Sequence, residues 1–155
     1  MRAPVRHLAV ALAGSVALAG IAVVGAAGSL WLNRGLPAVR LACADVGGIS
    51  PRDAMALVPA GVLWVDARLE RDHEVGHLAG AVCVNEMNWE AQVSALVFAW
   101  RPAMRVVVYA DRGDAGAARR VAALVRVAIG LRDVVFLDGN WRDLGAAFGI
   151  DGGAP

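Results

Sequence analysis

A β-branched run followed by a glycine-containing loop constrains the fold more than any other stretch of this sequence. Residues 106–108 are three valines, the kind of apolar run found in buried parallel strands, and Tyr109 closes the run. The six residues 110–115 then lead into a stretch whose apolar residues recur at helical spacing. In parallel α/β sheets, ligands bind where a strand feeds such a loop and the loop opens a helix. We therefore expect a site at this loop.

The chain around this loop alternates strand and helix patterns, which predicts a parallel sheet covered by helices on both faces. Ser50 and Pro51 have the pattern of a helix start. One predicted helix, residues 87–100, has an apolar side formed by Trp89, Val93, Leu96, Val97 and Trp100. The other predicted helices cover residues 51–58, 69–75, 116–128 and 141–148, and the other predicted strands cover residues 62–66, 81–84 and 134–137.

The N-terminal residues 8–32 form a run of 25 residues without charge. As a helix this run would be roughly 37 Å long, enough to cross a hydrocarbon core of about 30 Å. We interpret it as an uncleaved signal anchor. The alternative is a cleaved signal peptide, because small residues at 25–28 could suit a signal peptidase, although the run exceeds the usual apolar region of such peptides.

This anchor predicts a single-pass protein with three further segments. Arg2, Arg6 and the α-amino group precede the run, and Arg34 and Arg40 follow it, so a slight positive bias favours a cytoplasmic N-terminus. The globular part would then lie outside, in a bacterial periplasm or its equivalent. We expect a linker at residues 33–48, a domain at 49–148 and a flexible tail at 149–155.

Charge and cysteine content exclude several classes of function. After residue 40 the chain carries eleven arginines and fourteen acidic residues, a net charge of −3, which argues against nucleic-acid binding. The three histidines and two cysteines are too scattered for a zinc site, and no cofactor is indicated. Cys43 and Cys83 could form one disulfide or remain two free thiols, and the sequence leaves both open.

Residues 66–81 read DARLERDHEVGHLAGA and resemble the signature of rhodanese-like domains, which runs D-x-R, a short acidic helix and G-H-I-P-G-A. The matching positions are Asp66, Arg68, Gly76, His77, Gly80 and Ala81. The valine run with Tyr109 resembles that family's VVVYC strand, and residues 137–141 resemble its L-x-G-G-W turn. The resemblance covers residues 49–148 and implies a three-layer α/β/α fold on a five-stranded parallel sheet. A membrane helix before one such domain also occurs in the family.

The activity that this resemblance implies is sulfur transfer through a cysteine directly after the VVVY strand, which carries the sulfur as a persulfide. In this chain that residue is Ala110, which has no nucleophile. Ala115 stands where some members carry a second cysteine. Asp111 and Asp114 would oppose an anionic donor such as thiosulfate, and Arg112 offsets them only in part.

We therefore expect a catalytically inactive domain whose loop binds a partner protein or a small anionic ligand. The loop residues are Ala110, Asp111, Arg112, Gly113, Asp114 and Ala115. By the resemblance, Asp66 and Arg68 bond each other and the loop backbone, Tyr109 supports the loop, and His77 terminates a helix. Ligand contact by Asp66 and Arg68, or a catalytic base at His77, are the alternatives to these structural roles.

Two enzymatic functions compete with this interpretation. The first is sulfur transfer from thiosulfate or a persulfide through Cys83 or Cys43. The second is a phosphatase, because cell-cycle dual-specificity phosphatases share the fold. These phosphatases use the same cysteine and a longer loop. The alanine at position 110 and the loop of only six residues therefore argue against the phosphatase hypothesis.

Overall fold

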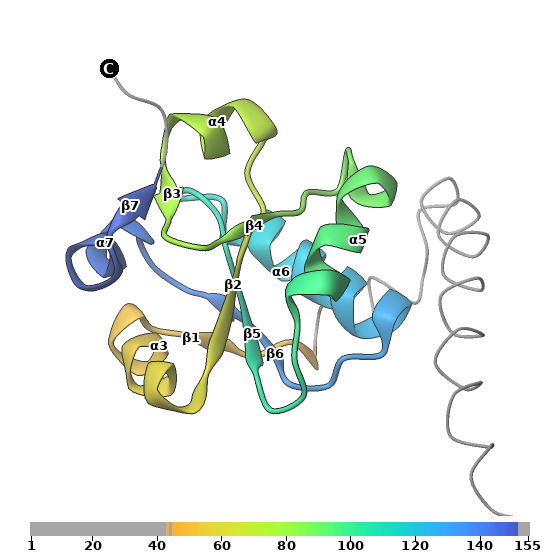
Figure 1. Cartoon of the computed structure of the whole chain (residues 1–155), viewed down its shortest axis with the longest axis horizontal. Coiled ribbons are helices and arrows are strands. Elements are labelled where there is room, and N and C mark those ends of the chain that lie inside the picture. Colours follow the sequence, from red (N-terminus) through yellow and green to blue (C-terminus); the bar gives the residue numbers. More distant parts are fainter. Residues whose placement is uncertain (1–42, 44, 152–155) are drawn as a thin grey trace, which may run out of the picture.

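A parallel five-stranded sheet lies at the centre of the computed structural model, which describes residue 43 and residues 45–151 (Figure 1). The strands are β1 (Gly48–Ile49), β2 (Val62–Asp66), β4 (Val82–Cys83), β5 (Arg105–Tyr109) and β6 (Val134–Leu137). Their order in the sheet is β1-β6-β5-β2-β4, and each neighbouring pair is parallel. The predicted α/β class and five-stranded parallel sheet are confirmed.

The central strand β5 is buried on both faces, which explains its unbroken valine run. Successive side chains of a strand point to opposite faces. Val106 and Val108 accordingly pack into one core cluster, while Val107 and Tyr109 pack into another, and all four are fully buried. Each face of the sheet therefore has its own hydrophobic core.

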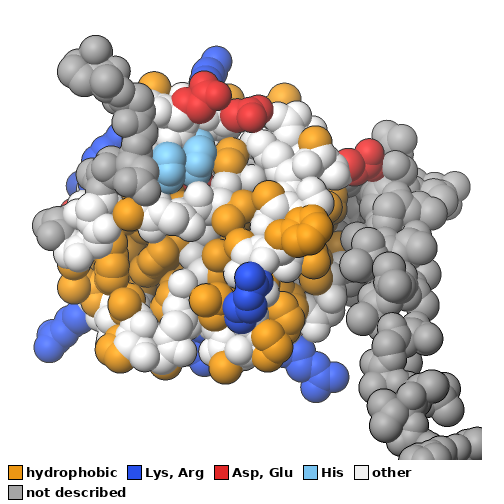
Figure 2. Space-filling model, in the orientation of Figure 1, with side chains coloured by type: hydrophobic (Ala, Val, Ile, Leu, Met, Phe, Trp, Pro, Cys, Tyr) orange, Lys and Arg blue, Asp and Glu red, His pale blue; other side chains and the backbone are white. Residues whose placement is uncertain are grey.

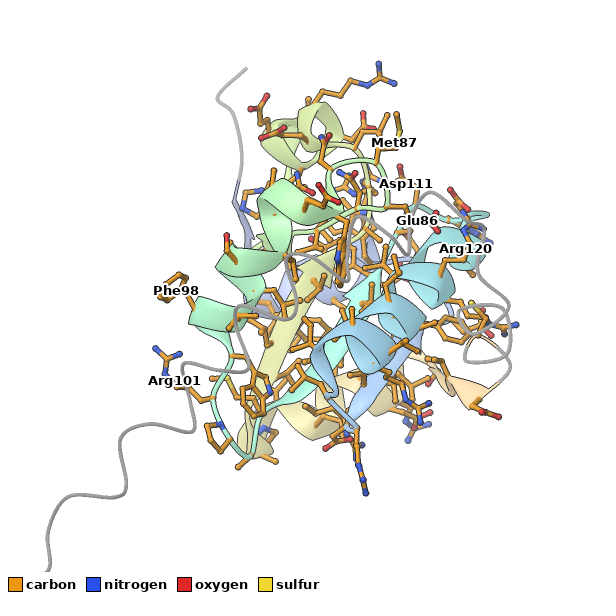
Figure 3. All side chains as sticks on the ribbon, turned by 90° about the vertical axis from the view of Figure 1, so that its right-hand side faces the viewer. Glu86, Met87, Phe98, Arg101, Asp111 and Arg120 are labelled. Carbon is orange, nitrogen blue, oxygen red and sulfur yellow. The ribbon has the colours of Figure 1, made fainter. Side chains whose placement is uncertain are left out.

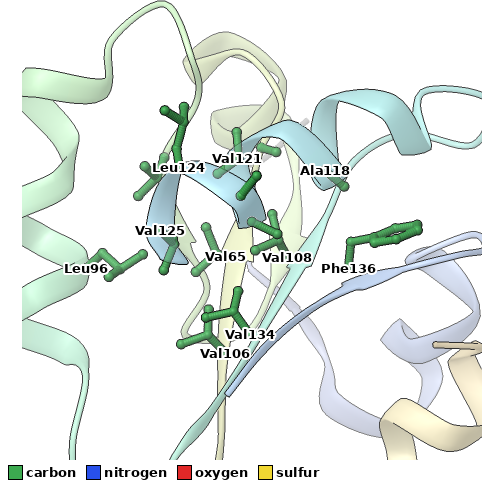
Figure 4. Close-up of a cluster of buried hydrophobic side chains, with 14 of the residues drawn as sticks. Val65, Leu96, Val106, Val108, Ala118, Val121, Leu124, Val125, Val134 and Phe136 are labelled. Atoms are coloured by element: carbon green, nitrogen blue, oxygen red, sulfur yellow. The ribbon is translucent and has the colours of Figure 1, made fainter. Parts of the chain in front are cut away.

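Helices cover both faces of the sheet (Figure 1). On one face lie α5 (Trp89–Ala99), α6 (Ala115–Leu124) and the π-helical turn η2 (Val125–Ile129). Figure 4 shows Leu96 of α5 and Val121 of α6 packed around Val65 and Val108 of the sheet. The other face is covered by α3 (Pro51–Leu57), η1 (Val58–Ala60) and α7 (Arg142–Phe148). Among the described residues, a further helix, α4 (Glu70–Val75), follows β2.

The helix start at Ser50 forms as its sequence predicts. The Ser50 hydroxyl accepts a hydrogen bond from the N–H of Asp53 at 3.2 Å, and Pro51 is the first helical residue. The apolar side predicted for residues 87–100 is wrong at one position. Val97 is 39% exposed, whereas Trp89 and Leu96 are buried. A helix turns by about 100° per residue, so the position after Leu96 turns away from the core.

The boundary between the predicted linker and the domain is wrong by a few residues. Val46 is only 4% exposed and belongs to the core, and Gly48 begins β1, which pairs with β6 at Phe136 and Leu137. A strand of two residues has too few positions to show a period of two, so the sequence carried no signal for it.

The predicted flexible tail is also wrong for its first residues. β7 (Ile150–Asp151) pairs antiparallel with β3 (His77–Leu78) in a second, two-stranded sheet. Gly149 ends α7 with a φ of 81°, and its carbonyl accepts a hydrogen bond from the N–H of Ala79 at 3.3 Å. Because Gly149 adopts this left-handed backbone conformation, the chain turns back toward β3. Composition alone does not predict this turn.

Within residue 43 and residues 45–151, no helix is long and apolar enough to cross a membrane. The predicted membrane helix, residues 8–32, lies outside the described residues.

We expect Gly139→Ala to lower the free energy of unfolding by about 1–3 kcal/mol, in the range of an overpacked site. A Cβ at Gly139 would lie 2.7 Å from both Cγ and Cδ of Pro51, and the proline ring is too rigid to move aside. Urea denaturation followed by circular dichroism measures the change. Gly47→Ala is the control, because a Cβ there has no neighbour within 4 Å. Equal stabilities of the two variants would contradict this packing argument.

Candidate functional site

The carboxyl ends of β2, β4 and β5 meet at one edge of the sheet, and the loops that follow them form the candidate site. Asp66 ends β2 and is paired in the sheet with Tyr109 of β5 on one side. On the other side it is paired with Cys83 of β4. Parallel sheets bind ligands at this edge, so the loop after Tyr109 lies where a ligand loop is expected.

The loop between β5 and α6 consists of Ala110, Asp111, Arg112, Gly113 and Asp114. It is one residue shorter than predicted because Ala115 already belongs to α6. The Asp114 carboxylate caps this helix by accepting a hydrogen bond from the N–H of Ala117 at 3.1 Å. Gly113 has a φ of 100°, in the left-handed region that favours glycine, so it permits the turn. Ala110 is 5% exposed and packs into the core beneath the loop.

The fully buried carboxylate of Asp66 anchors this edge of the sheet. Nε and Nη2 of Arg68 donate to its two oxygens at 2.9 and 2.6 Å, and the N–H of Arg68 donates to Oδ1 at 3.0 Å. The Tyr109 hydroxyl donates to Oδ2 at 3.1 Å. The predicted pairing of Asp66 with Arg68 is therefore present, as a bidentate ion pair.

Arg68 and Tyr109 hold fixed protonation states in this network. Burial by itself would lower the pKa of Arg68, but the hydrogen bonds and charge of Asp66 leave that pKa raised. Burial, reinforced by the charge of Asp66, raises the pKa of Tyr109 far above its ordinary value. Tyr109 is thus neutral, and its oxygen accepts a hydrogen bond from the N–H of Leu78 at 3.2 Å. This contact joins β5 to β3.

His77 hydrogen-bonds to the last turn of α4. Its Nδ1 lies 2.8 Å from the carbonyl oxygen of His73, and because a carbonyl only accepts, this nitrogen carries the proton. The two imidazole rings are stacked with centroids 3.7 Å apart, and Figure 2 shows the histidines side by side on the surface. Nδ1 of His73 lies 3.1 Å from Oδ2 of Asp66, so the pair extends the Asp66 network.

A cavity of about 290 Å³ opens beside the loop. It is lined by residues that follow all three strands, namely Ala67, Arg68, Leu69, Asp72, Asn85, Glu86, Met87, Ala110, Asp111, Asp114, Ala117 and Arg120. Figure 3 shows Glu86, Met87, Asp111 and Arg120 grouped at this end, away from Phe98 and Arg101. Both lining arginines are already paired, Arg68 with Asp66 at 2.6 Å and Arg120 with Glu86 at 2.8 Å.

The cavity brings together only part of the predicted site. Ala110, Asp111, Asp114 and Arg68 line it. Arg112 and Gly113 are exposed outside it, and Ala115 is half-buried at the start of α6. Asp66, Tyr109 and His77 support the edge from beneath or beside it rather than line the cavity.

Several lining residues were not predicted. Asn85 and Glu86 follow the predicted strand at 81–84, and the rule that parallel strands end at one edge could have found them. Asn85 is 3% exposed, and its side-chain amide donates to the carbonyl oxygen of Arg68 at 3.2 Å. Met87 is 81% exposed at the rim. Arg120 had no sequence signal beyond its place in a basic helix.

Neither cysteine lines the cavity, and both are free thiols. Burial, together with the charges of Asp66 and Glu70, raises the pKa of Cys83 to about 11. Burial and Glu86 also raise the pKa of Cys43 above its ordinary value. Because the thiolate is the nucleophile, both groups are mostly unreactive at neutral pH. Within residue 43 and residues 45–151, no three His, Cys, Asp or Glu side chains are grouped to hold a metal ion.

Comparison with solved structures finds several similar folds. A protein from Anabaena sp. is 18% identical, with a TM-score of 0.50 over 67% of this chain and 91% of the other. A rhodanese-related protein from Thermoplasma volcanium is 13% identical, with a TM-score of 0.48 over 68% of this chain and 97% of the other. A protein from Rhodopseudomonas palustris, described as a possible tyrosine phosphatase, is 24% identical, with a TM-score of 0.47 over 69% and 87%.

No curated protein matches the chain significantly. The family model of the rhodanese-like domain matches residues 50–147. This range spans the structure from Ser50, which caps α3, to the penultimate residue of α7. It includes the Asp66–Arg68 pair, the loop after Tyr109 and the final helix with its preceding turn. The chain therefore belongs to the rhodanese-like domain family.

Proposed function

We propose that this chain is a membrane-anchored, catalytically inactive rhodanese-like domain whose β5–α6 loop binds a partner protein or a small ligand. The observation that carries the proposal is Ala110, directly after Tyr109, at the position where the family resemblance places the nucleophilic cysteine. A methyl group has no lone pair to attack sulfur and cannot hold a persulfide.

The surroundings of Ala110 support a binding role for the loop. Arg68 and Tyr109 both hydrogen-bond to the buried Asp66 carboxylate beneath it, and Gly113 permits the turn of the loop. The loop also borders a cavity of about 290 Å³, at the lower end of the usual range for ligand pockets. The exposed Met87 at the rim adds an adaptable apolar contact of the kind used at protein interfaces.

The membrane part of the proposal rests on the sequence alone. The uncharged residues 8–32 are long enough to span a bilayer. Two arginines flank this run on each side, so the α-amino group gives the N-terminal side a slight positive bias, which favours a cytoplasmic N-terminus and an extracytoplasmic domain. The binding site would then face the periplasm or its equivalent.

The alternative, sulfur transfer through another cysteine, meets two obstacles. The raised pKa of Cys83, about 11, leaves only about 0.01% thiolate at pH 7. The hydrogen bond that Nε2 of Gln92 donates to this sulfur at 3.6 Å favours the thiolate, but burial and the nearby acids outweigh it. Cys43 has a raised pKa as well, so neither thiol is activated.

The full chain in detergent is expected to transfer no sulfur from thiosulfate to cyanide above a no-protein control, because its loop has no nucleophile. Thiocyanate formation and mass spectrometry for a bound persulfide measure this. The Cys83→Ser and Cys43→Ser variants serve as matched arms. Turnover in the unmodified chain that disappears in one of these two variants would replace the binding proposal with the enzymatic alternative.

Restoring the cysteine alone is expected to give little activity. Ala110→Cys supplies a thiol, but Asp111 and Asp114 remain beside it and repel an anionic donor. Changing both acids to asparagine in the Ala110→Cys background should raise the rate at least about tenfold, since each unit charge a few ångströms away contributes about 1 kcal/mol or more. The rate of thiocyanate formation is compared between these two variants. Robust turnover by Ala110→Cys alone would show that the loop acids do not control donor access.

A further inference from the structure

The carboxylate of Asp111 lies among three positively polarised groups that converge on one of its oxygens. Nε1 of Trp141 donates to Oδ1 at 3.3 Å. Nη1 of Arg142 lies 3.7 Å from the same oxygen, and Nη1 of Arg68 lies 3.8 Å from it. We call the set of Arg68, Trp141 and Arg142 the cradle. Its members come from the loop after β2 and from the start of α7, so the cradle joins two segments that are distant in sequence.

Two members of the cradle, Arg68 and Trp141, are held in place by contacts other than those to Asp111. Arg68 uses Nε and Nη2 for Asp66, and Nη2 also donates to the carbonyl of Gly76 at 2.6 Å. This leaves Nη1 as the end of the guanidinium that faces Asp111. Trp141 is 1% exposed, and its indole is locked in the second core cluster.

Two cations share the indole ring in this arrangement. The guanidinium carbon of Arg68 lies 4.5 Å from the ring centroid of Trp141, and that of Arg142 lies 4.7 Å from it. Each contact is favourable by itself, but the two positive charges repel each other. The Asp66 carboxylate offsets the charge of Arg68, and Asp111 is the acid that faces both guanidinium groups.

We propose that the Asp111 carboxylate occupies the anion position of this cradle. Its negative charge thereby determines whether the site can bind a negatively charged ligand. With Asp111 in place, a free oxyanion would have to displace a tethered carboxylate, whose effective concentration is high. The site therefore excludes small oxyanions. Without the Asp111 charge, the cradle becomes a site for a single oxyanion such as sulfate, held by two guanidinium groups and an indole N–H.

This inference rests on the proposed function in one respect, namely that the β5–α6 loop is a ligand-binding loop. It refines that function by excluding the small anionic ligand that the sequence left open. The side chain of Asp111 is 50% exposed, so its replacement is compatible with folding.

The test is sulfate binding by the full chain in detergent. Sodium sulfate is titrated by isothermal calorimetry, with sodium chloride holding the ionic strength constant. Asp111→Asn keeps the shape of the side chain and removes its charge, and Asp111→Ser is a second variant. Asp143→Asn is the matched control, because Asp143 is an exposed acid adjacent to Arg142 whose carboxylate contacts Asn140 at 3.3 Å.

We expect both Asp111 variants to bind sulfate at least about tenfold more tightly than the unmodified chain and the Asp143→Asn control, on the same charge-proximity argument. Adding Arg142→Gln to Asp111→Asn should abolish the gain. Equal sulfate affinities of Asp111→Asn, Asp143→Asn and the unmodified chain would overturn the proposal, as would a gain that persists without Arg142. Sulfate carries no transferable sulfur, so this result is independent of whether the chain forms a persulfide.

Discussion

The candidate site depends on the buried ion pair between Asp66 and Arg68. A carboxylate at zero exposure is tolerated only when its charge is paired and its oxygens are hydrogen-bonded. Asp66 meets this condition through Arg68, Tyr109 and His73, which come from three different segments. Within the described residues, no buried side-chain nitrogen or oxygen lacks a partner. The contacts to the Asp66 carboxylate thus hold the end of β2, the end of β5 and the helix α4 together.

This dependence explains how the loop can keep its position without a nucleophile. None of the contacts to Asp66 involves the side chain of Ala110, which packs into the core below the loop and borders the cavity. The backbone is held by Tyr109 before it and by the Asp114 cap after it. In the function that we propose, the alanine at position 110 removes the nucleophile that the family resemblance implies and leaves the geometry of the loop intact. The loop would then recognise a ligand by its shape and charge.

The sequence predicted those features that depend on neighbouring residues. The valine run of β5, the Ser50 cap and the Asp66–Arg68 pair each have a signal within a few positions, and all are present. The short strands β1, β3 and β7 carry no periodic signal, because each has two residues and forms only by pairing with a distant partner. The cradle around Asp111 was not predictable for the same reason. Trp141 and Asp111 are 30 positions apart, and only the folded sheet brings them together.

The energetics of the Asp66–Arg68 pair indicate what it contributes to this domain. A buried ion pair gains little over apolar residues of similar volume, because the cost of removing both charges from water offsets their attraction. Removing one partner, however, leaves an unpaired buried charge and costs about 3–5 kcal/mol. The pair thus contributes little to the free energy of unfolding, but it fixes the orientation of the Arg68 side chain. It orients Arg68 so that Nη1 faces the loop, next to the indole of Trp141. The contacts that surround the buried Asp66 carboxylate therefore place the positive charge of Arg68 toward the loop. The Asp111 carboxylate, which belongs to the loop itself, faces that charge.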